Sequence, residues 1–180
     1  EFCPDIACCN NTLSATIIPK NILCNNQCTG TATVTPAGGT SPYTYLWSNA
    51  QTTQVISGLC AGIYSVLVTD AKNSTATATV TITQPLSALS SSVTLTNAGC
   101  NCNGSASVAA SGGTPGYTYF WNPAAAGQTT ANATGLCAGA YTITVTDANG
   151  CTSTQTAAIT QPPAFTVSVT AGTASCKTAD

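Results

Sequence analysis

Residues 38–47 read Gly-Gly-Thr-Ser-Pro-Tyr-Thr-Tyr-Leu-Trp, and residues 112–121 read Gly-Gly-Thr-Pro-Gly-Tyr-Thr-Tyr-Phe-Trp. In both stretches two tyrosines and a tryptophan occupy alternate positions, so all three share one face if the segment is a β-strand. Paired glycines before such a run are typical of the turn that leads into a strand. The two stretches therefore predict an aromatic-faced strand in each of two repeated units.

The repetition continues beyond the tryptophans. Gly58–Tyr64 recurs as Gly135–Tyr141, and Thr83-Gln84-Pro85 recurs as Thr160-Gln161-Pro162. The offset is 74 residues through the tryptophan and 77 after it, so the extra residues fall in a loop around 123–127. We expect four segments: a cysteine-rich N-terminal segment (1–11), repeat 1 (12–85), repeat 2 (86–163), and a C-terminal strand with a cysteine tail (164–180).

Alternation of apolar and polar residues predicts the other strands. Residues 75–83 alternate strictly, with threonine at every other position, and in residues 64–69 Tyr64, Val66 and Val68 alternate with Ser65, Leu67 and Thr69. This period of two buries one face of a strand and leaves the other in water. Tyr64 and Tyr141 stand where a tyrosine corner would occur. We therefore predict an all-β protein: two tandem immunoglobulin-like antiparallel β-sandwiches, rich in disulfides, with an extra C-terminal strand.

The composition excludes several classes of function. Charged residues make up 4% of the chain, with three lysines, no histidine and a net charge of −2, whereas an average domain has about 25% charged residues. Nucleic-acid binding needs a basic surface, and general acid–base catalysis needs titratable groups. We expect no enzyme, no cofactor, no bound metal and no nucleic-acid partner. We also expect no membrane span, because no apolar run approaches about 20 residues.

The repeated motifs resemble a known family. The pattern Gly-Gly-Thr-x-x-Tyr-Thr-Tyr-x-Trp is followed by Gln-Thr-Thr, Gly-Leu-x-Ala-Gly-x-Tyr and, in repeat 2, Val-Thr-Asp-Ala-Asn-Gly-Cys. This set is similar to the SprB-type repeat of bacterial surface adhesins and, more distantly, to the PKD-type immunoglobulin-like domain. The resemblance covers about residues 28–83 and 102–160. It implies secreted, tandem, cell-surface β-domains used in adhesion, gliding or surface appendages, without catalytic residues.

Eleven cysteines in 180 residues indicate an oxidising, extracellular compartment. The chain begins Glu1-Phe2-Cys3 without a signal pattern, so we interpret it as a mature secreted chain. Repeat 1 has Ala71-Lys72-Asn73-Ser74 where repeat 2 ends its motif in Asn-Gly-Cys, so repeat 1 lacks a counterpart of Cys151.

Three disulfides follow from these positions. The start of the second strand and the corner before the fifth lie at the same end of a sandwich, which pairs Cys28 with Cys60 and, equivalently, Cys102 with Cys137. Cys24 lies in the loop of repeat 1 that faces repeat 2, and we pair it with Cys151. The alternative bond from Cys100 to Cys151 would have to span a sandwich about 20 Å long, whereas disulfide Cα atoms lie about 4.4–6.8 Å apart.

The remaining cysteines and the last strand are candidates for contacts between subunits. Residues 165–170 alternate like a strand and resemble the opening of repeat 2, as if a third repeat began there. An unpaired strand is a template for pairing with another chain. The candidates between subunits are Cys3, Cys8, Cys9, Cys100, Cys176, Phe165, Val167 and Val169.

Other residues have a structural and a functional interpretation. Asp70 and Asp147 suit turns better than calcium sites, which need more oxygen ligands. The alternation turns Leu46, Phe120 and Leu67 outward, where a group of apolar side chains would mark a contact surface. Four Asn-x-Ser/Thr sequons are possible glycosylation sites: Asn10, Asn73, Asn103 and Asn132.

Two functions remain open at the level of the sequence. The first is an extracellular structural subunit of a cell-surface filament or stalk, a homopolymer that assembles head to tail through terminal strands and disulfides. The second is a ligand- or glycan-binding repeat fragment of a large adhesin, which would contact surface glycans or other cells. Covalent ladders or filaments of the native material are expected only for the first.

Overall fold

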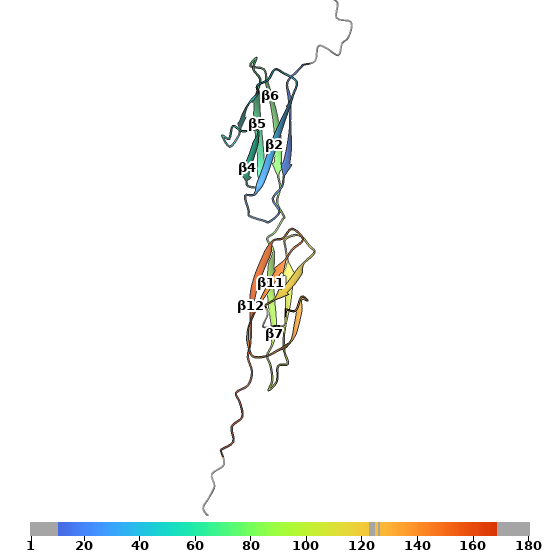
Figure 1. The fold of residues 1–180 in the computed structure, drawn as a ribbon, viewed down its shortest axis with the longest axis vertical. Coiled ribbons are helices and arrows are strands. Elements are labelled where there is room, and N and C mark those ends of the chain that lie inside the picture. The colour runs from blue at the N-terminus through green and yellow to red at the C-terminus, as the bar shows by residue number, and fades with distance from the viewer. Residues whose placement is uncertain (1–10, 123–124, 126, 169–180) are drawn as a thin grey trace, which may run out of the picture.

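The computed structural model describes residues 11–122, 125 and 127–168. They form an elongated protein in which two β-sandwiches follow one another end to end (Figure 1). In the described part of the chain no helix is long and apolar enough to cross a membrane. Each sandwich has a core of its own, one around Trp47 and the other around Trp121.

Repeat 1 contains two three-stranded antiparallel sheets. The first has the order β1-β2-β4, with β1 at Ser14–Lys20, β2 at Gly30–Ala37 and β4 at Val55–Leu59. The second has the order β3-β5-β6, with β3 at Thr44–Trp47, β5 at Gly62–Thr69 and β6 at Thr75–Ile82. This matches the A-B-E and C-F-G sheets of the immunoglobulin fold, without strand D.

Repeat 2 has the same topology. Its first sheet is ordered β7-β8-β10, with β7 at Ser90–Thr96, β8 at Gly104–Ser111 and β10 at Asn132–Leu136. Its second sheet is ordered β9-β11-β12, with β9 at Thr118–Trp121, β11 at Gly139–Thr146 and β12 at Thr152–Ile159. The fold is therefore all-β, with two tandem immunoglobulin-like sandwiches, as the sequence predicts.

The aromatic residues of the two quoted stretches, 38–47 and 112–121, lie inward. Trp47 and Trp121 are fully buried, and each indole Nε1 donates a 2.9 Å hydrogen bond to a backbone oxygen, that of Thr53 or Thr130. Burial of an indole is favourable when its N–H finds such a partner. Tyr64 and Tyr141 form tyrosine corners, since each hydroxyl donates to the carbonyl four residues earlier.

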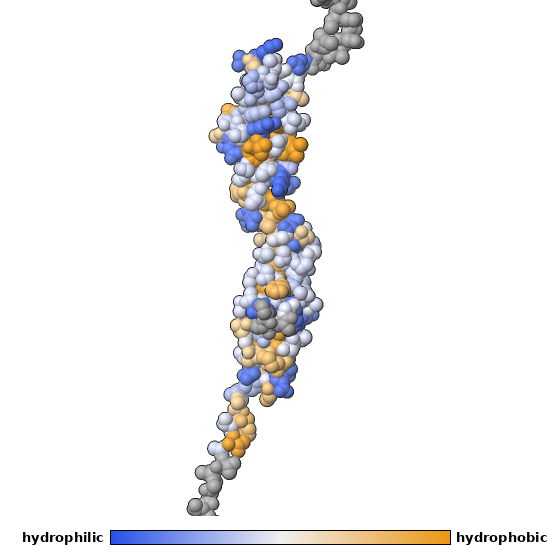
Figure 2. Space-filling view, viewed as in Figure 1, coloured by the Kyte–Doolittle hydropathy of each residue, from blue (hydrophilic) through white to orange (hydrophobic). Residues whose placement is uncertain are grey.

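The outer faces of the sheets carry threonine and a few apolar side chains. Leu46 on β3 lies directly opposite Leu67 on β5, and they are 53% and 37% exposed. In repeat 2 Phe120 is also 53% exposed, but its neighbour on β11 is Thr144. Most of the visible surface is pale or blue, with scattered orange patches (Figure 2). The two repeats thus share an inner pattern and differ in their outer apolar contacts.

The expected extra strand after repeat 2 differs from its prediction. Residues 160–168 form no strand ladder, and Phe165 and Val167 are 92% and 69% exposed. An isolated extended segment gains no ladder hydrogen bonds, and no strand among the described residues lies beside it to supply them. Val169 and Cys176, which belong to the same prediction, lie outside the described residues.

Candidate functional site at the junction of the repeats

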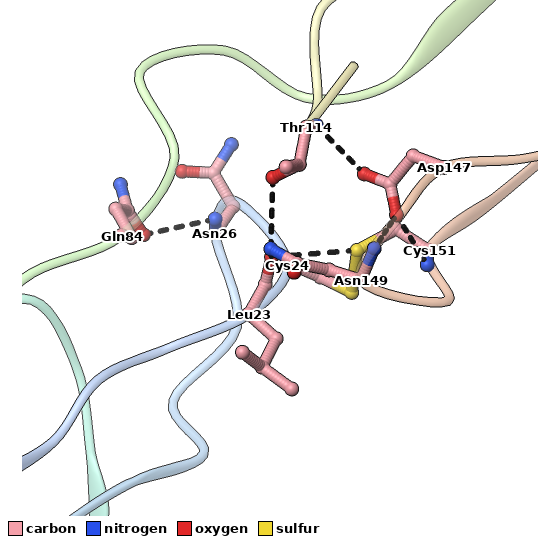
Figure 3. The surroundings of a disulfide bond; sticks show 8 residues. All are labelled: Leu23, Cys24, Asn26, Gln84, Thr114, Asp147, Asn149 and Cys151. Carbon is pink, nitrogen blue, oxygen red and sulfur yellow. Dashed lines mark hydrogen bonds between the residues drawn. A yellow bond between two sulfur atoms is a disulfide. The ribbon is translucent and has the colours of Figure 1, made fainter. Parts of the chain in front are cut away.

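A disulfide joins the two sandwiches. Cys24 lies in the loop between β1 and β2, and Cys151 lies immediately before β12. They are 127 residues apart in sequence, and their Cα atoms are 5.7 Å apart. Figure 3 shows the two loops meeting at this bond. The structure thus brings together the pair that sequence reasoning assigns to the junction.

Asn149 adds hydrogen bonds beside the disulfide. Its Nδ2 donates to the backbone oxygen of Leu23 in repeat 1, at 3.1 Å, and to Thr114 Oγ1 within repeat 2, at 2.8 Å (Figure 3). The side chain therefore bridges both repeats. Sequence reasoning missed this role, although Asn149 stands in the quoted Asp-Ala-Asn-Gly-Cys motif, because the motif alone does not show what faces it.

The turn that presents Asn149 and Cys151 is held by Asp147. Its Oδ1 accepts hydrogen bonds from the backbone N–H groups of Asn149 and Cys151, both at 2.9 Å. Its Oδ2 accepts one from Thr114 N–H, also at 2.9 Å. Gly113 packs against this carboxylate, where an added Cβ would lie 2.5 Å from Oδ2, and its φ is +61°. The second glycine of Gly-Gly-Thr is therefore required by close approach and by backbone conformation.

Asp70 holds the corresponding turn of repeat 1. Its carboxylate accepts from the N–H groups of Thr40, Lys72 and Ser74. Burial raises the pKa of both aspartates, but the backbone donors outweigh it and hold each pKa below its ordinary value. Both residues are thus turn organisers, as the sequence favours. Among the described residues no group of three or more His, Cys, Asp or Glu side chains could hold a metal.

The linker between the repeats is held by asparagines of the β1–β2 loop. Asn21 Oδ1 accepts from Thr83 N–H at 3.0 Å, and Asn25 Nδ2 donates to the Pro85 oxygen at 2.7 Å. Asn26 N–H donates to Gln84 Oε1 at 3.0 Å (Figure 3). The chain leaving repeat 1 is therefore fixed to the same loop that carries Cys24.

A shallow groove of about 250 Å³ lies beside the disulfide. Its lining includes Asn25, Gln27, Leu89 and Thr152 together with the bonded cysteines. It is an open and partly polar depression on the junction.

The other two predicted pairs lie within the sandwiches. Cys28 is bonded to Cys60, and Cys102 is bonded to Cys137, each with a Cα–Cα distance of 3.9 Å. Both bonds join the start of the second strand to the corner before the fifth. They are separated in sequence by 32 and 35 residues. Equivalent cysteines of the two repeats are therefore paired in the same way.

Cys100 is exposed and forms no disulfide with the described residues. Asn73, Asn103 and Asn132 are exposed, although the Asn103 side chain accepts a hydrogen bond from Gly99 N–H. The remaining candidates named from the sequence lie outside the described residues: Cys3, Cys8, Cys9, Asn10, Val169 and Cys176.

One family model and several solved structures are similar to parts of this chain. The SprB repeat model matches residues 16–52 and 92–126, and no curated protein matches the chain. A C-terminal 282-residue fragment of intimin, in complex with the intimin-binding domain of the translocated intimin receptor, is 18% identical, with a TM-score of 0.48. That match covers 81% of this chain, which spans 63% of the intimin fragment.

Two further structures are similar over most of the chain. Amphioxus IgVJ-C2 is 12% identical with a TM-score of 0.32, and covers 82% of this chain and 96% of its own. Murine CEACAM1b is 14% identical with a TM-score of 0.32, and covers 84% and 99%. The family matches fall on equivalent strands of the two sandwiches. In each they run from the first strand to beyond the strand that ends in the buried tryptophan. The SprB repeat model thus matches once in each sandwich, which is consistent with two tandem copies.

Proposed function

We propose that this protein is an extracellular structural subunit of a cell-surface filament or stalk, built from SprB repeats and joined head to tail to the next unit. The observation that carries the proposal is the junction. A disulfide and a side-chain bridge from Asn149 join one repeat to the next, and the contact from Asn25 to Pro85 holds the linker between them. Such a joint suits a stiff rod with a defined direction.

The cysteines support an extracellular location. Three disulfides in a chain with few charges are typical of a secreted protein in an oxidising compartment. A net charge of −2 also gives little repulsion between copies. Both properties suit a protein that assembles outside the cell.

The end of repeat 2 supports head-to-tail assembly. Leu13, Leu89 and Phe165 are spaced 76 residues apart, each at the start of an alternating segment. Leu13 is buried in the core of repeat 1, and Leu89 packs against that of repeat 2, whereas Phe165 is 92% exposed. We infer that residues from 164 onward enter the sandwich of the next unit. A contact of this kind does not close on itself and builds a filament.

A second function rests on a different observation. Leu46 and Leu67 are exposed cross-strand neighbours on the outer face of the β3-β5-β6 sheet. A ligand-binding adhesin repeat would use such a face, and no equivalent pair exists in repeat 2, where Thr144 replaces Leu67. Replacing both leucines by threonine would abolish binding to cells or glycans under this function. It would leave a filament intact under the first.

Electron microscopy and non-reducing gels of the oxidised full chain test the proposed function. We expect filaments of the width of one sandwich and a ladder of covalent multimers that collapses on reduction. One variant replaces Cys100 and Cys176 by serine, and a second variant lacks residues 164–180. We expect these changes to remove the filaments and the covalent ladder. A wild-type chain that stays monomeric in oxidising buffer would instead favour the adhesin repeat.

A further inference from the structure

The junction between the repeats has two halves with different chemistry. We call the β1–β2 loop of repeat 1 the donor half, because it belongs to the preceding repeat; the name does not refer to hydrogen bonding. It contributes the Cys24 sulfur and the Leu23 carbonyl, which accepts the hydrogen bond. We call the turn 147–151 of repeat 2 the acceptor half, because it belongs to the following repeat. It contributes the Cys151 sulfur and the Asn149 amide, which donates the hydrogen bond. Each half can therefore be sought separately in either repeat.

The acceptor half is absent from repeat 1. Its turn runs Asp70-Ala71-Lys72-Asn73-Ser74, and Asp70 organises it with the same backbone hydrogen bonds. At the position of Gly150, Asn73 has a positive φ of 63°. Only the side chains differ: lysine stands where Asn149 donates, and serine stands where Cys151 forms its bond. Repeat 1 therefore has the backbone of the turn but lacks the amide and the thiol that join the repeats.

The donor half is present in repeat 2. Cys100 lies 76 residues after Cys24, and Asn97 lies 76 residues after Asn21. Asn97 Oδ1 accepts from Thr160 N–H at 3.1 Å, as Asn21 Oδ1 accepts from Thr83 N–H at 3.0 Å. The loop that carries Cys100 is therefore anchored as in repeat 1.

The backbone of the two loops also agrees. Ala98 N–H donates to the Thr160 oxygen at 2.9 Å, as Ile22 N–H donates to the Thr83 oxygen at 2.9 Å. Cys100 thus occupies the place of Cys24 at the far end of repeat 2, and it is exposed. Phe165 and Val167, which are also exposed, leave the sandwich just after Thr160. Both features face whatever follows repeat 2.

We propose that Cys100 forms a disulfide with the cysteine of an Asp-x-Asn-Gly-Cys turn in a following SprB-type repeat. The inference deepens the proposed function and rests on it, because it names the partner surface of the next unit. Two thiols lose two protons and two electrons as the S–S bond forms. A small disulfide oxidant, such as oxidised glutathione, takes them up and is reduced to two thiols.

The proposal makes the order of repeats directional. Repeat 2 has both an acceptor and a donor half, whereas repeat 1 has only a donor half. A second copy of this chain that docks through the turn of repeat 1 meets Ser74 and gains no covalent bond to Cys100 there. A covalent ladder of wild-type chains would therefore be formed by other cysteines, such as Cys176. The unit joined to Cys100 is therefore a repeat of the repeat 2 type, whether it continues the same chain or lies on another.

Completing the acceptor in repeat 1 tests this directly. The full chain with Lys72→Asn, Asn73→Gly and Ser74→Cys receives the missing amide and thiol on the same Asn-Gly-Cys sequence. Thr40 already stands where Thr114 binds Asn149. In concentrated solution with oxidised glutathione, we expect a covalent ladder. Peptide mapping should find Cys100 linked to residue 74 by a disulfide. The Cys100 thiol should then no longer react with an alkylating reagent. The matched control adds Cys100→Ser and should lose the ladder.

The outcomes separate this inference from the proposed function. A folded triple variant whose Cys100 stays fully alkylatable, with no bond to residue 74, overturns the inference. So does a wild-type polymer in which Cys100 is bonded to Cys3, Cys8 or Cys9, although that result supports the filament. If the wild-type chain stays monomeric while the triple variant polymerises, the result supports the disulfide between Cys100 and the Asp-x-Asn-Gly-Cys turn. The same result contradicts assembly of this chain with itself alone.

Discussion

Asn149 Nδ2 lies 3.1 Å from the backbone oxygen of Leu23, a contact that spans 126 positions of sequence and the boundary between two sandwiches. The contact depends on a carboxylate that touches neither atom. Asp147 fixes the backbone of the turn through the N–H groups of Asn149 and Cys151, and the turn then aims the amide and the thiol at repeat 1. Residues 147–151 therefore provide the side of the junction that belongs to repeat 2.

Replacing Asn149 by alanine should loosen the junction without unfolding either repeat. The change removes two hydrogen bonds, each of which contributes about 0.5–1.5 kcal/mol. In a Cys24→Ser background, small-angle scattering should show a wider spread of angles between the repeats. The control is Lys72→Ala at the equivalent position of repeat 1, which should change nothing. An unchanged spread for Asn149→Ala would show that the linker alone sets the angle.

Removing the Cys28–Cys60 bond should destabilise repeat 1 selectively. A closed loop of this size contributes about 3–4 kcal/mol in the chain-entropy model. Each repeat holds one tryptophan, so a Trp121→Phe variant reports repeat 1 by the fluorescence of Trp47, and the converse variant reports repeat 2. The double alanine variant should unfold at a lower denaturant concentration only in the Trp47 signal. A parallel loss in the Trp121 signal would mean that the repeats unfold as one unit.

Stability should fall in acid because of the two turn aspartates. In the folded state the pKa of Asp70 and of Asp147 lies below the ordinary value, after burial is offset by backbone hydrogen bonds. Their contribution is fully present above the unfolded pKa of about 3.9 and is lost as the pH falls through the folded value. Thermal melts from pH 6 to pH 2 should show this decline. Asp147→Asn should melt lower at pH 6 and decline less, and an equal decline would place its origin elsewhere.

The tyrosine corner of repeat 2 should make a small and separable contribution. Tyr141→Phe removes the 3.0 Å hydrogen bond to the Cys137 oxygen and leaves the buried ring. The expected loss in unfolding free energy is about 0.5–1.5 kcal/mol. Tyr119→Phe is the matched control, because the Tyr119 hydroxyl makes no hydrogen bond with the described residues. Equal effects of the two changes would remove the corner as the explanation.

Most of the fold follows from local pattern. Alternation over 64–69 and 75–83 predicts strands because one face must be buried, and the tryptophan stretch identifies which face. The internal repeat then predicts equivalent corners, and the structure joins the same three cysteine pairs. The strands follow from neighbours along the chain, and the Cys28–Cys60 and Cys102–Cys137 pairs follow from equivalent positions of the repeat. The Cys24–Cys151 pair follows from the two loops that lie at the ends facing one another.

The rest depends on contacts that no local pattern encodes. Asn149 acts across the junction, and Asn25 and Asn26 hold the linker at residues 84–85. An asparagine in a loop gives no sign of its distant partner. Alternation over 165–170 predicts a strand, but a strand exists only with a neighbour to bond. Residues 160–168 therefore remain without a ladder in this structure.

The bond between Cys24 and Cys151 also determines how the protein responds to mechanical pulling. Tension applied at Asn11 and Ser168 follows the backbone to Cys24, crosses the sulfur atoms and continues from Cys151 along β12. Every strand from β2 to β11 lies outside that covalent path and cannot be drawn out. After reduction of all three disulfides residues 25–150 join the path and could lengthen it by roughly 400 Å, at about 3.3–3.6 Å per residue. One disulfide therefore makes two extensible domains into a nearly inextensible tether.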